Sequence, residues 1–151
     1  MPTEGLDRLG PPRPSTSNPY AVQADRRSTI RVLLVDDHRM LRQGLRSIID
    51  DCDSMQVVGE ASNGVEAIEA VAISRPDVVV MDINMPKMHG IQATQHIKQM
   101  FPETAIIGLS VQTGREIIEK MQAAGISFYL TKESAVETLC AAIEDAVTHK
   151  K

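Results

Sequence analysis

Short apolar runs alternate with longer amphipathic stretches from Ile30 to Val147. The runs are too short for helices, and several are rich in valine and isoleucine, so they predict β-strands. They are apolar almost throughout rather than alternating, which is typical of parallel strands covered on both faces. The predicted strands are residues 30–35, 57–61, 78–81, 105–109 and 128–130.

The stretches between these runs have the spacing of amphipathic helices. The predicted helices cover about residues 41–49, 65–74, 91–100, 115–124 and 135–147. Asn63 is a candidate N-cap for the second, and Gly125 a candidate left-handed C-cap for the fourth. Five strand–helix units in succession predict an α/β fold, a parallel sheet with helices on both faces. The working site of such a fold lies outside the carboxyl ends of its strands.

The first 28 residues show neither the helical nor the strand periodicity, and five of the eight prolines lie in the first 19 residues. We expect a disordered tail over residues 1–28, for which a solvated leader or a misassigned start codon is a simpler explanation than a functional segment. One folded domain is expected over residues 29–148. Residues 149–151 then begin a linker or end the domain.

Composition narrows the function classes. A length of 151 residues suits one domain, and no apolar stretch is long enough to span a membrane or to serve as a signal peptide, so we expect a cytoplasmic protein. A net charge of -4 and 3% aromatic residues argue against direct contact with nucleic acid. Cys52 and Cys140, far apart in the chain, are expected to be lone thiols in a reducing compartment.

Chemically active side chains follow four of the five predicted strands: Asp36 and Asp37, Asp82, Ser110, and Lys132. Parallel strands bring these ends to one edge of the sheet. Three carboxylates there repel one another unless a cation intervenes, and Mg²⁺ prefers oxygen ligands, including those of phosphate. Lys132 and Ser110 suit a phosphate, and an aspartate can act as the nucleophile that forms an aspartyl-phosphate. The pattern therefore predicts Mg²⁺-dependent phosphorylation of an aspartate.

Each of these residues also has an ordinary explanation, as a helix cap, a turn residue or a solvated charge. Their joint occurrence at matching strand ends favours the site. In the loop after Asp82, Pro86 stiffens the turn, and Gly90 is expected to adopt a backbone conformation that other residues avoid. His89, with no second histidine or cysteine nearby, is expected to be an exposed loop side chain.

Together, Asp36-Asp37, Asp82 with Met85-Pro86 and Gly90, Ser110 and Lys132 resemble the receiver domain of two-component response regulators. The resemblance covers about residues 30–147. Segments 38–45, 57–64 and 125–133 are similar to the NarL/FixJ (LuxR-type) subfamily, including a glutamate after the lysine where many receivers have proline. The resemblance implies a flavodoxin-like (βα)5 doubly wound sheet with strand order 2-1-3-4-5.

The resemblance also implies roles for single residues. Asp82 is then the phosphoacceptor. Asp37 and Asp82 bind Mg²⁺ directly, with the backbone carbonyl of Asn84 as a third ligand, and Asp36 acts through a metal-bound water. Ser110 and Lys132 contact the phosphoryl group.

Tyr129 resembles the switch aromatic, which swings inward when Ser110 moves toward the phosphate, although a plain edge-strand aromatic is the alternative. The residues that set the hydrolysis rate in the family are Asn84 and Gln112 here, and neither is charged. The switch is expected to change the surface formed by the fourth helix, fifth strand and fifth helix.

The implied partner is a sensor histidine kinase, and phosphorylation-linked homodimerisation is a family expectation. Transcription control through a DNA-binding domain absent from this chain is the favoured output. A stand-alone receiver or a hybrid-kinase receiver in a phosphorelay is the alternative. A Mg²⁺-dependent phosphohydrolase is disfavoured, because Asn84 stands where such phosphatases carry aspartate and the loops leave little room for a substrate. A receiver-like domain that is never phosphorylated is disfavoured because the required residues are present.

Overall fold

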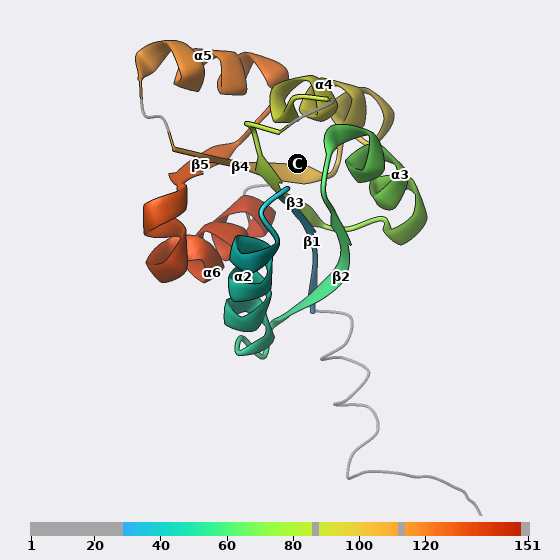
Figure 1. Cartoon of the computed structure of the whole chain (residues 1–151). Helices are drawn as coiled ribbons and strands as arrows, with labels where there is room; N and C mark the ends of the chain where they lie inside the picture. The colour runs from blue at the N-terminus through green and yellow to red at the C-terminus, as the bar shows by residue number, and fades with distance from the viewer. Residues whose placement is uncertain (1–28, 86–87, 112–113, 149–151) are drawn as a thin grey trace, which may run out of the picture.

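The computed structural model describes residues 29–85, 88–111 and 114–148. Five parallel strands form one sheet in the order β2-β1-β3-β4-β5, which confirms the predicted fold and strand order (Figure 1). The strands are β1 Ile30–Val35, β2 Met55–Ala61, β3 Val78–Asp82, β4 Ala105–Ser110 and β5 Phe128–Thr131. Because the order reverses between β1 and β3, the carboxyl ends of these two strands mark the switch point of the sheet.

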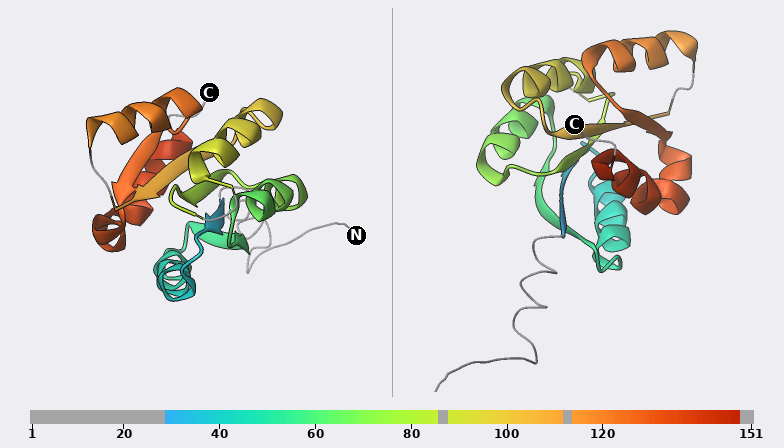
Figure 2. Two further views of the ribbon diagram at one scale, coloured as in Figure 1. Left: turned by 45° about the horizontal axis from the view of Figure 1, so that its top comes forward. Right: turned by 180° about the vertical axis from the view of Figure 1, so that it is seen from behind.

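Helices cover both faces of the sheet. They are α2 Arg39–Asp50, α3 Gly64–Ser74, α4 Gly90–Met100, α5 Arg115–Ala124 and α6 Lys132–Thr148. The pair α2 and α6 packs on one face, and α3, α4 and α5 pack on the other, as both views of Figure 2 show. Among the described residues, no helix is long and apolar enough to cross a bilayer.

The alternation of side chains along the central strands divides the core into two layers. Val32 and Leu34 of β1 face α2 and α6, whereas Leu33 and Val35 face α3 and α4. All four side chains are at most 1% exposed, so every position of the run is apolar. Burial on both faces therefore explains why these strands lack the alternating pattern of a half-exposed sheet.

Two predicted helix caps are confirmed. The Asn63 side chain accepts a hydrogen bond from the Glu66 amide at 2.9 Å, and Gly125 ends α5 with φ of 110°. The structure differs at α6, which begins at Lys132 rather than near Ala135. Thr131 Oγ1 accepts a hydrogen bond from the Ser134 amide at 3.1 Å and so caps the first turn of the helix. This turn has no apolar periodicity, so the sequence pattern does not predict it.

The expectation of two separate cysteines is wrong. The sulfur atoms of Cys52, which follows α2, and Cys140, in α6, lie in contact and within reach of a disulfide. The sequence hides this proximity because 88 residues separate the two positions. They meet because α2 and α6 pack beside each other on the same face of the sheet.

Candidate functional site

The ends of β1, β3 and β5 bring four predicted site residues together. Lys132, the first residue of α6, places its Nζ 3.1 Å from Asp82 Oδ2 and 3.6 Å from Asp36 Oδ2. Asp36, Asp37 and Asp82 lie close enough that one carboxylate oxygen of each falls within 4.8 Å of the others. The topology thus gathers residues from positions 36 to 132 of the chain into one acidic cluster with a single ammonium among them.

Asp82 is the last residue of β3 and is fully buried. Burial raises its pKa to about 6, and the neighbouring charge of Asp36 adds to the shift. The Asn84 amide, which donates to Oδ1 at 3.0 Å, and the Lys132 ammonium oppose it. Asp82 is therefore a poorly hydrated carboxylate that any further cation at this edge would favour.

Asp36 carries an oxygen that the surrounding protein does not satisfy. The side chain is 1% exposed, and Oδ1 accepts from the His38 amide at 2.7 Å. Oδ2 has no hydrogen-bond partner within the described residues, since Lys132 Nζ stands off at 3.6 Å. A buried carboxylate oxygen that lacks a hydrogen bond and lies beside two other carboxylates fits a bound cation. The cluster is an acidic pocket that can hold a metal ion.

His38 also lies in this cluster, although no role was predicted for it from the sequence. Its Nδ1 lies 3.2 Å from Asp36 Oδ1, 3.3 Å from Asp37 Oδ1 and 3.3 Å from Lys132 Nζ. The available signal was its place directly after the aspartate pair, where the chain turns from β1 into α2. His89, in contrast, is exposed at the start of α4, as expected.

Gly90 is required for a different reason from the one predicted. Its φ is not positive, so it needs no special backbone conformation. A Cβ at this position would lie 2.5 Å from Ile83 Cα and would also collide with the carbonyl oxygen of Asp82. The Gly90 amide instead donates to the Ile83 carbonyl at 3.2 Å. This glycine lets α4 begin against the backbone that carries Asp82.

An arginine supports the turn that carries the aspartate pair. Arg42 of α2 donates through its guanidinium to the Asp36 carbonyl at 2.6 Å and through Nε to Glu60 at 2.7 Å. Arg46 also donates to Glu60. Burial raises the pKa of Glu60, but the hydrogen bonds from the two arginines prevail and hold it below its usual value. Glu60 therefore stays charged and anchors Arg42.

The two predicted switch residues lie on neighbouring strands. Ser110 ends β4 and is fully buried, and Tyr129 in β5 is 39% exposed. In the register of the strands, Gly108 is opposite Tyr129, and Ser110 is opposite Thr131. Tyr129 thus points its ring at the surface from an edge strand, two positions from the residue paired with Ser110.

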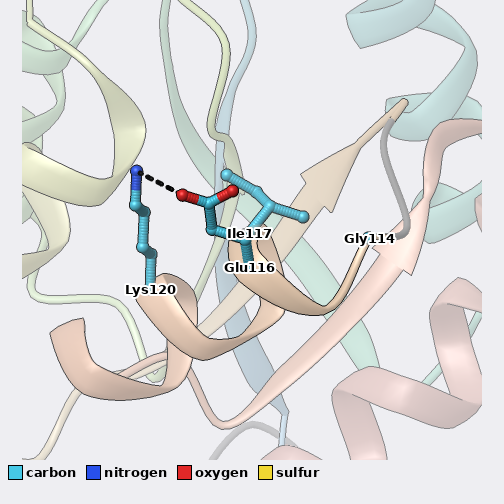
Figure 3. Close-up of a pocket in the computed structure, with 4 residues that line it drawn as sticks. All are labelled: Gly114, Glu116, Ile117 and Lys120. Carbon is cyan, nitrogen blue, oxygen red and sulfur yellow. Dashed lines mark ion pairs between the residues drawn. The ribbon is translucent and has the colours of Figure 1, made fainter.

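Two surface hollows lie apart from the acidic cluster. One, on α5, is lined by Gly114, Glu116, Ile117 and Lys120, with Glu116 and Lys120 paired at 4.0 Å (Figure 3). The other is lined by residues 75–77, before β3, and 100–104, before β4, so it lies at the amino ends of these strands. Neither is lined by Asp82, Lys132 or the aspartate pair.

Comparison with known proteins identifies the family. Residues 32–144 match the model of the response regulator receiver domain. The chain is 38% identical over 110 residues to the uncharacterized transcriptional regulatory protein YhcZ of Bacillus subtilis, covering 73% of this chain and 51% of that protein. It is 38% identical over 122 residues to response regulator UvrY of Escherichia coli, covering 81% and 56%. The chain spans about half the length of the curated relatives it matches.

Solved structures agree. A LuxR-family two-component response regulator from Aurantimonas sp. SI85-9A1 is 37% identical with a TM-score of 0.77, over 82% of this chain and 89% of that one. The response regulator domain of Thermotoga maritima CheB is 33% identical with a TM-score of 0.76, over 82% and 99%. The resemblance inferred from the sequence is confirmed, and the chain belongs to the receiver domains of two-component response regulators, within the NarL/FixJ subfamily.

Proposed function

We propose that this chain is a phosphoryl-controlled switch in which Asp82 accepts a phosphoryl group from the phosphohistidine of a sensor histidine kinase. The observation that carries the proposal is the placement of Asp82, buried and bonded to Lys132, beside a buried oxygen of Asp36 that accepts no hydrogen bond from the described residues. The chemistry acts on the protein itself, so the domain is a regulatory module rather than an enzyme with an external substrate.

In the proposed transfer, a carboxylate oxygen of Asp82 attacks phosphorus while the bond from phosphorus to the imidazole nitrogen of the kinase breaks. The imidazole leaves with the electron pair of that bond. Lys132, 3.1 Å from Asp82, is placed to neutralise charge on the phosphoryl oxygens, and electrostatic stabilisation of this kind supplies most of the rate in phosphoryl transfer. Ser110, at the end of the adjacent strand, is the proposed hydroxyl donor to the group once it is attached.

Mg²⁺ is the proposed cofactor, held by Asp37, Asp82 and the backbone carbonyl of Asn84, with Asp36 acting through a bound water. When bound, it supplies positive charge that stabilises the attacking and equatorial oxygens. Lys132 holds the Asp82 carboxylate in place before transfer through its hydrogen bond to Oδ2. The Asn84 amide orients Asp82 through its hydrogen bond to Oδ1.

The proposed module covers residues 29–148, with a tail before it and a linker or end after it. Its proposed output is transcription control in the cytoplasm through a DNA-binding domain outside this chain. Two matched relatives are named as a transcriptional regulatory protein and a response regulator, and both are about twice as long as the matched segment. A stand-alone receiver or a hybrid-kinase receiver is the alternative, and phosphorylation-linked homodimerisation remains a proposal.

The test is the intact mass of the protein after incubation with acetyl phosphate or phosphoramidate, with and without Mg²⁺. We expect one acid-stable, base-labile phosphoryl group that appears only with Mg²⁺. Asp82→Asn should abolish it, and Lys132→Gln should slow its appearance by about a hundredfold. Asp51→Asn, at the end of α2, is the control and should behave as the unaltered protein. Phosphorylation of Asp82→Asn at an unchanged rate would refute the assignment.

A further inference from the structure

We propose that His38 supplies an imidazole nitrogen, Nδ1, as a ligand to the divalent cation held by the aspartates, so that the site favours late first-row ions such as Co²⁺ over Mg²⁺. The inference rests on the cation site of the proposed function and adds a ligand and a selectivity to it. It gives a role to a side chain that reaches the acidic cluster from the start of α2.

The spacing of the donor atoms suits one ion. An octahedral ion with bonds of about 2.1 Å places adjacent ligands about 3.0 Å apart and opposite ligands about 4.2 Å apart. Nδ1 of His38 lies 3.3 Å from Asp37 Oδ1, close to the spacing of adjacent ligands, and 3.2 Å from Asp36 Oδ1, which acts through a bound water. One donor atom from each of Asp36, Asp37, His38 and Asp82 falls within 4.8 Å of all the others. A pair of donors at 4.8 Å must close by about 0.6 Å to reach the spacing of opposite ligands, and the Asn84 carbonyl and water supply the remaining ligands.

The contacts of Nδ1 cannot all be hydrogen bonds. An imidazole nitrogen carries either a lone pair or a hydrogen, the Lys132 ammonium only donates, and an ionised carboxylate only accepts. Nδ1 faces both kinds of partner, at 3.3 Å from Lys132 Nζ and 3.2 Å from Asp36 Oδ1. A metal ion resolves the conflict, because it takes the nitrogen lone pair and the carboxylate oxygens at the same time.

The cluster is already arranged around a positive charge. The Lys132 ammonium lies 3.1 Å from Asp82 Oδ2, 3.6 Å from Asp36 Oδ2 and 3.3 Å from His38 Nδ1. Asp36 Oδ2 is buried and lacks a hydrogen bond among the described residues. Lys132 meets the charge of this oxygen at 3.6 Å without a hydrogen bond, so the cluster can take a further cation beside the ammonium.

The backbone fixes where the imidazole starts. The His38 amide donates to Asp36 Oδ1 at 2.7 Å, and its carbonyl accepts from the Arg42 amide at 3.0 Å in the first turn of α2. The side chain is 64% exposed, so the ring can adjust and an ion can enter from solvent. The backbone of His38 is therefore fixed while its imidazole ring can move. A side chain that closes over an incoming ion needs both properties.

The selectivity follows from ligand chemistry. Mg²⁺ prefers oxygen and keeps much of its water, so an imidazole adds little to its binding. Imidazole suits later first-row ions, whose affinity rises from Mn²⁺ to Co²⁺ and Ni²⁺ for such donors. Removing His38 should therefore weaken Co²⁺ binding and leave Mg²⁺ binding almost unchanged.

The experiment compares the whole chain with His38→Asn and with the matched control His96→Asn, an exposed histidine on α4. Calorimetric titration measures Co²⁺ and Mg²⁺ affinity, and pulsed electron paramagnetic resonance on the Mn²⁺-loaded protein detects ¹⁴N bonded to the metal. We expect His38→Asn to weaken Co²⁺ binding by about tenfold or more and to change Mg²⁺ binding by less than about twofold. The ¹⁴N signal should be present in the unaltered protein and in His96→Asn, and absent in His38→Asn.

Two outcomes overturn the inference in different ways. Mg²⁺ binding with Mg²⁺-dependent phosphorylation, but no ¹⁴N signal in the unaltered protein or an equal loss of both metals in His38→Asn, removes His38 as a ligand and leaves the proposed function standing. Failure of the unaltered protein to bind any of the three ions, together with no phosphoryl group, removes the cation site itself and the proposed function with it.

Discussion

At the scale of one residue, burial of the Asp82 carboxylate lowers the stability of the folded protein. Its pKa is raised to about 6 by burial and by Asp36, so the folded protein binds a proton that the unfolded chain, with a pKa of 3.8, releases. Between these two values the folded state holds more protons, and the free energy of unfolding falls as pH rises. Above about pH 6 the metal-free protein therefore carries the full destabilisation.

Asp82→Asn should consequently stabilise the metal-free protein at neutral pH. We expect its free energy of unfolding in a chelator to exceed that of the unaltered protein by on the order of 2 kcal/mol near pH 7.5, because the neutral amide replaces a buried charge. Near pH 4.5, where the Asp82 carboxyl is protonated, most of the difference should disappear. Urea unfolding at both pH values measures it. If Asp82→Asn were less stable than the unaltered protein near pH 7.5, the buried charge of Asp82 would not be destabilising.

At the scale of the element, the start of α4 depends on close contact with the strand that carries Asp82. In Gly90→Ala, the new Cβ would press on Ile83 and on the Asp82 carbonyl, so α4 must shift away from β3. We expect a loss of about 1–3 kcal/mol in the free energy of unfolding, with slower phosphorylation of Asp82. Gly44→Ala in α2 is the control, because a Cβ there meets nothing within 4 Å, and it should stabilise slightly. Equal behaviour of the two variants would contradict the steric explanation.

The turn between β1 and α2 depends on Arg42. Arg42→Gln removes the donor to the Asp36 carbonyl, so the aspartate pair should lose part of its fixed orientation. We expect Mg²⁺ affinity to fall by about tenfold. Arg46→Gln removes contacts to Glu60 and Asp50 but none to the aspartate pair, and it should leave the affinity within about twofold. Titration of both variants with Mg²⁺ separates a positioning effect from a general loss of surface charge, which would lower both equally.

The sequence alone predicts the elements and most of the site because local signals mark them. The apolar runs, the Asn63 cap and Gly125 are all read correctly from nearby residues. The sequence does not predict contacts between residues that are far apart in the chain. His38 and Lys132 are 94 residues apart in the chain, and no local periodicity indicates that their side chains meet. The same holds for the Cys52–Cys140 pair and for the support that Glu60 gives Arg42.

At the scale of the whole molecule, the site and its proposed output surface share the sheet. Asp82 in β3 pairs with Leu109 in β4, whose next residue, Ser110, pairs with Thr131 in β5. A phosphoryl group on Asp82 that draws the Ser110 hydroxyl toward it would act one strand away from Tyr129. Because the ring of Tyr129 is partly exposed, a change in its solvent exposure can report on this path.

Phosphorylation should therefore bury Tyr129. The chain has two tyrosines, so Tyr20→Phe leaves Tyr129 as the single site for 3-fluorotyrosine, whose ¹⁹F resonance responds to solvent. With Mg²⁺ and beryllofluoride as a phosphoryl mimic, we expect a second resonance with reduced solvent exposure to replace the first, because the ring moves inward as Ser110 moves toward Asp82. Ser110→Ala should bind the mimic and yet weaken the shift, since the hydroxyl carries the coupling. Asp82→Asn should show none. An unchanged resonance in a protein that has bound the mimic would make Tyr129 an ordinary edge-strand aromatic and would place the output of the switch elsewhere on the molecule.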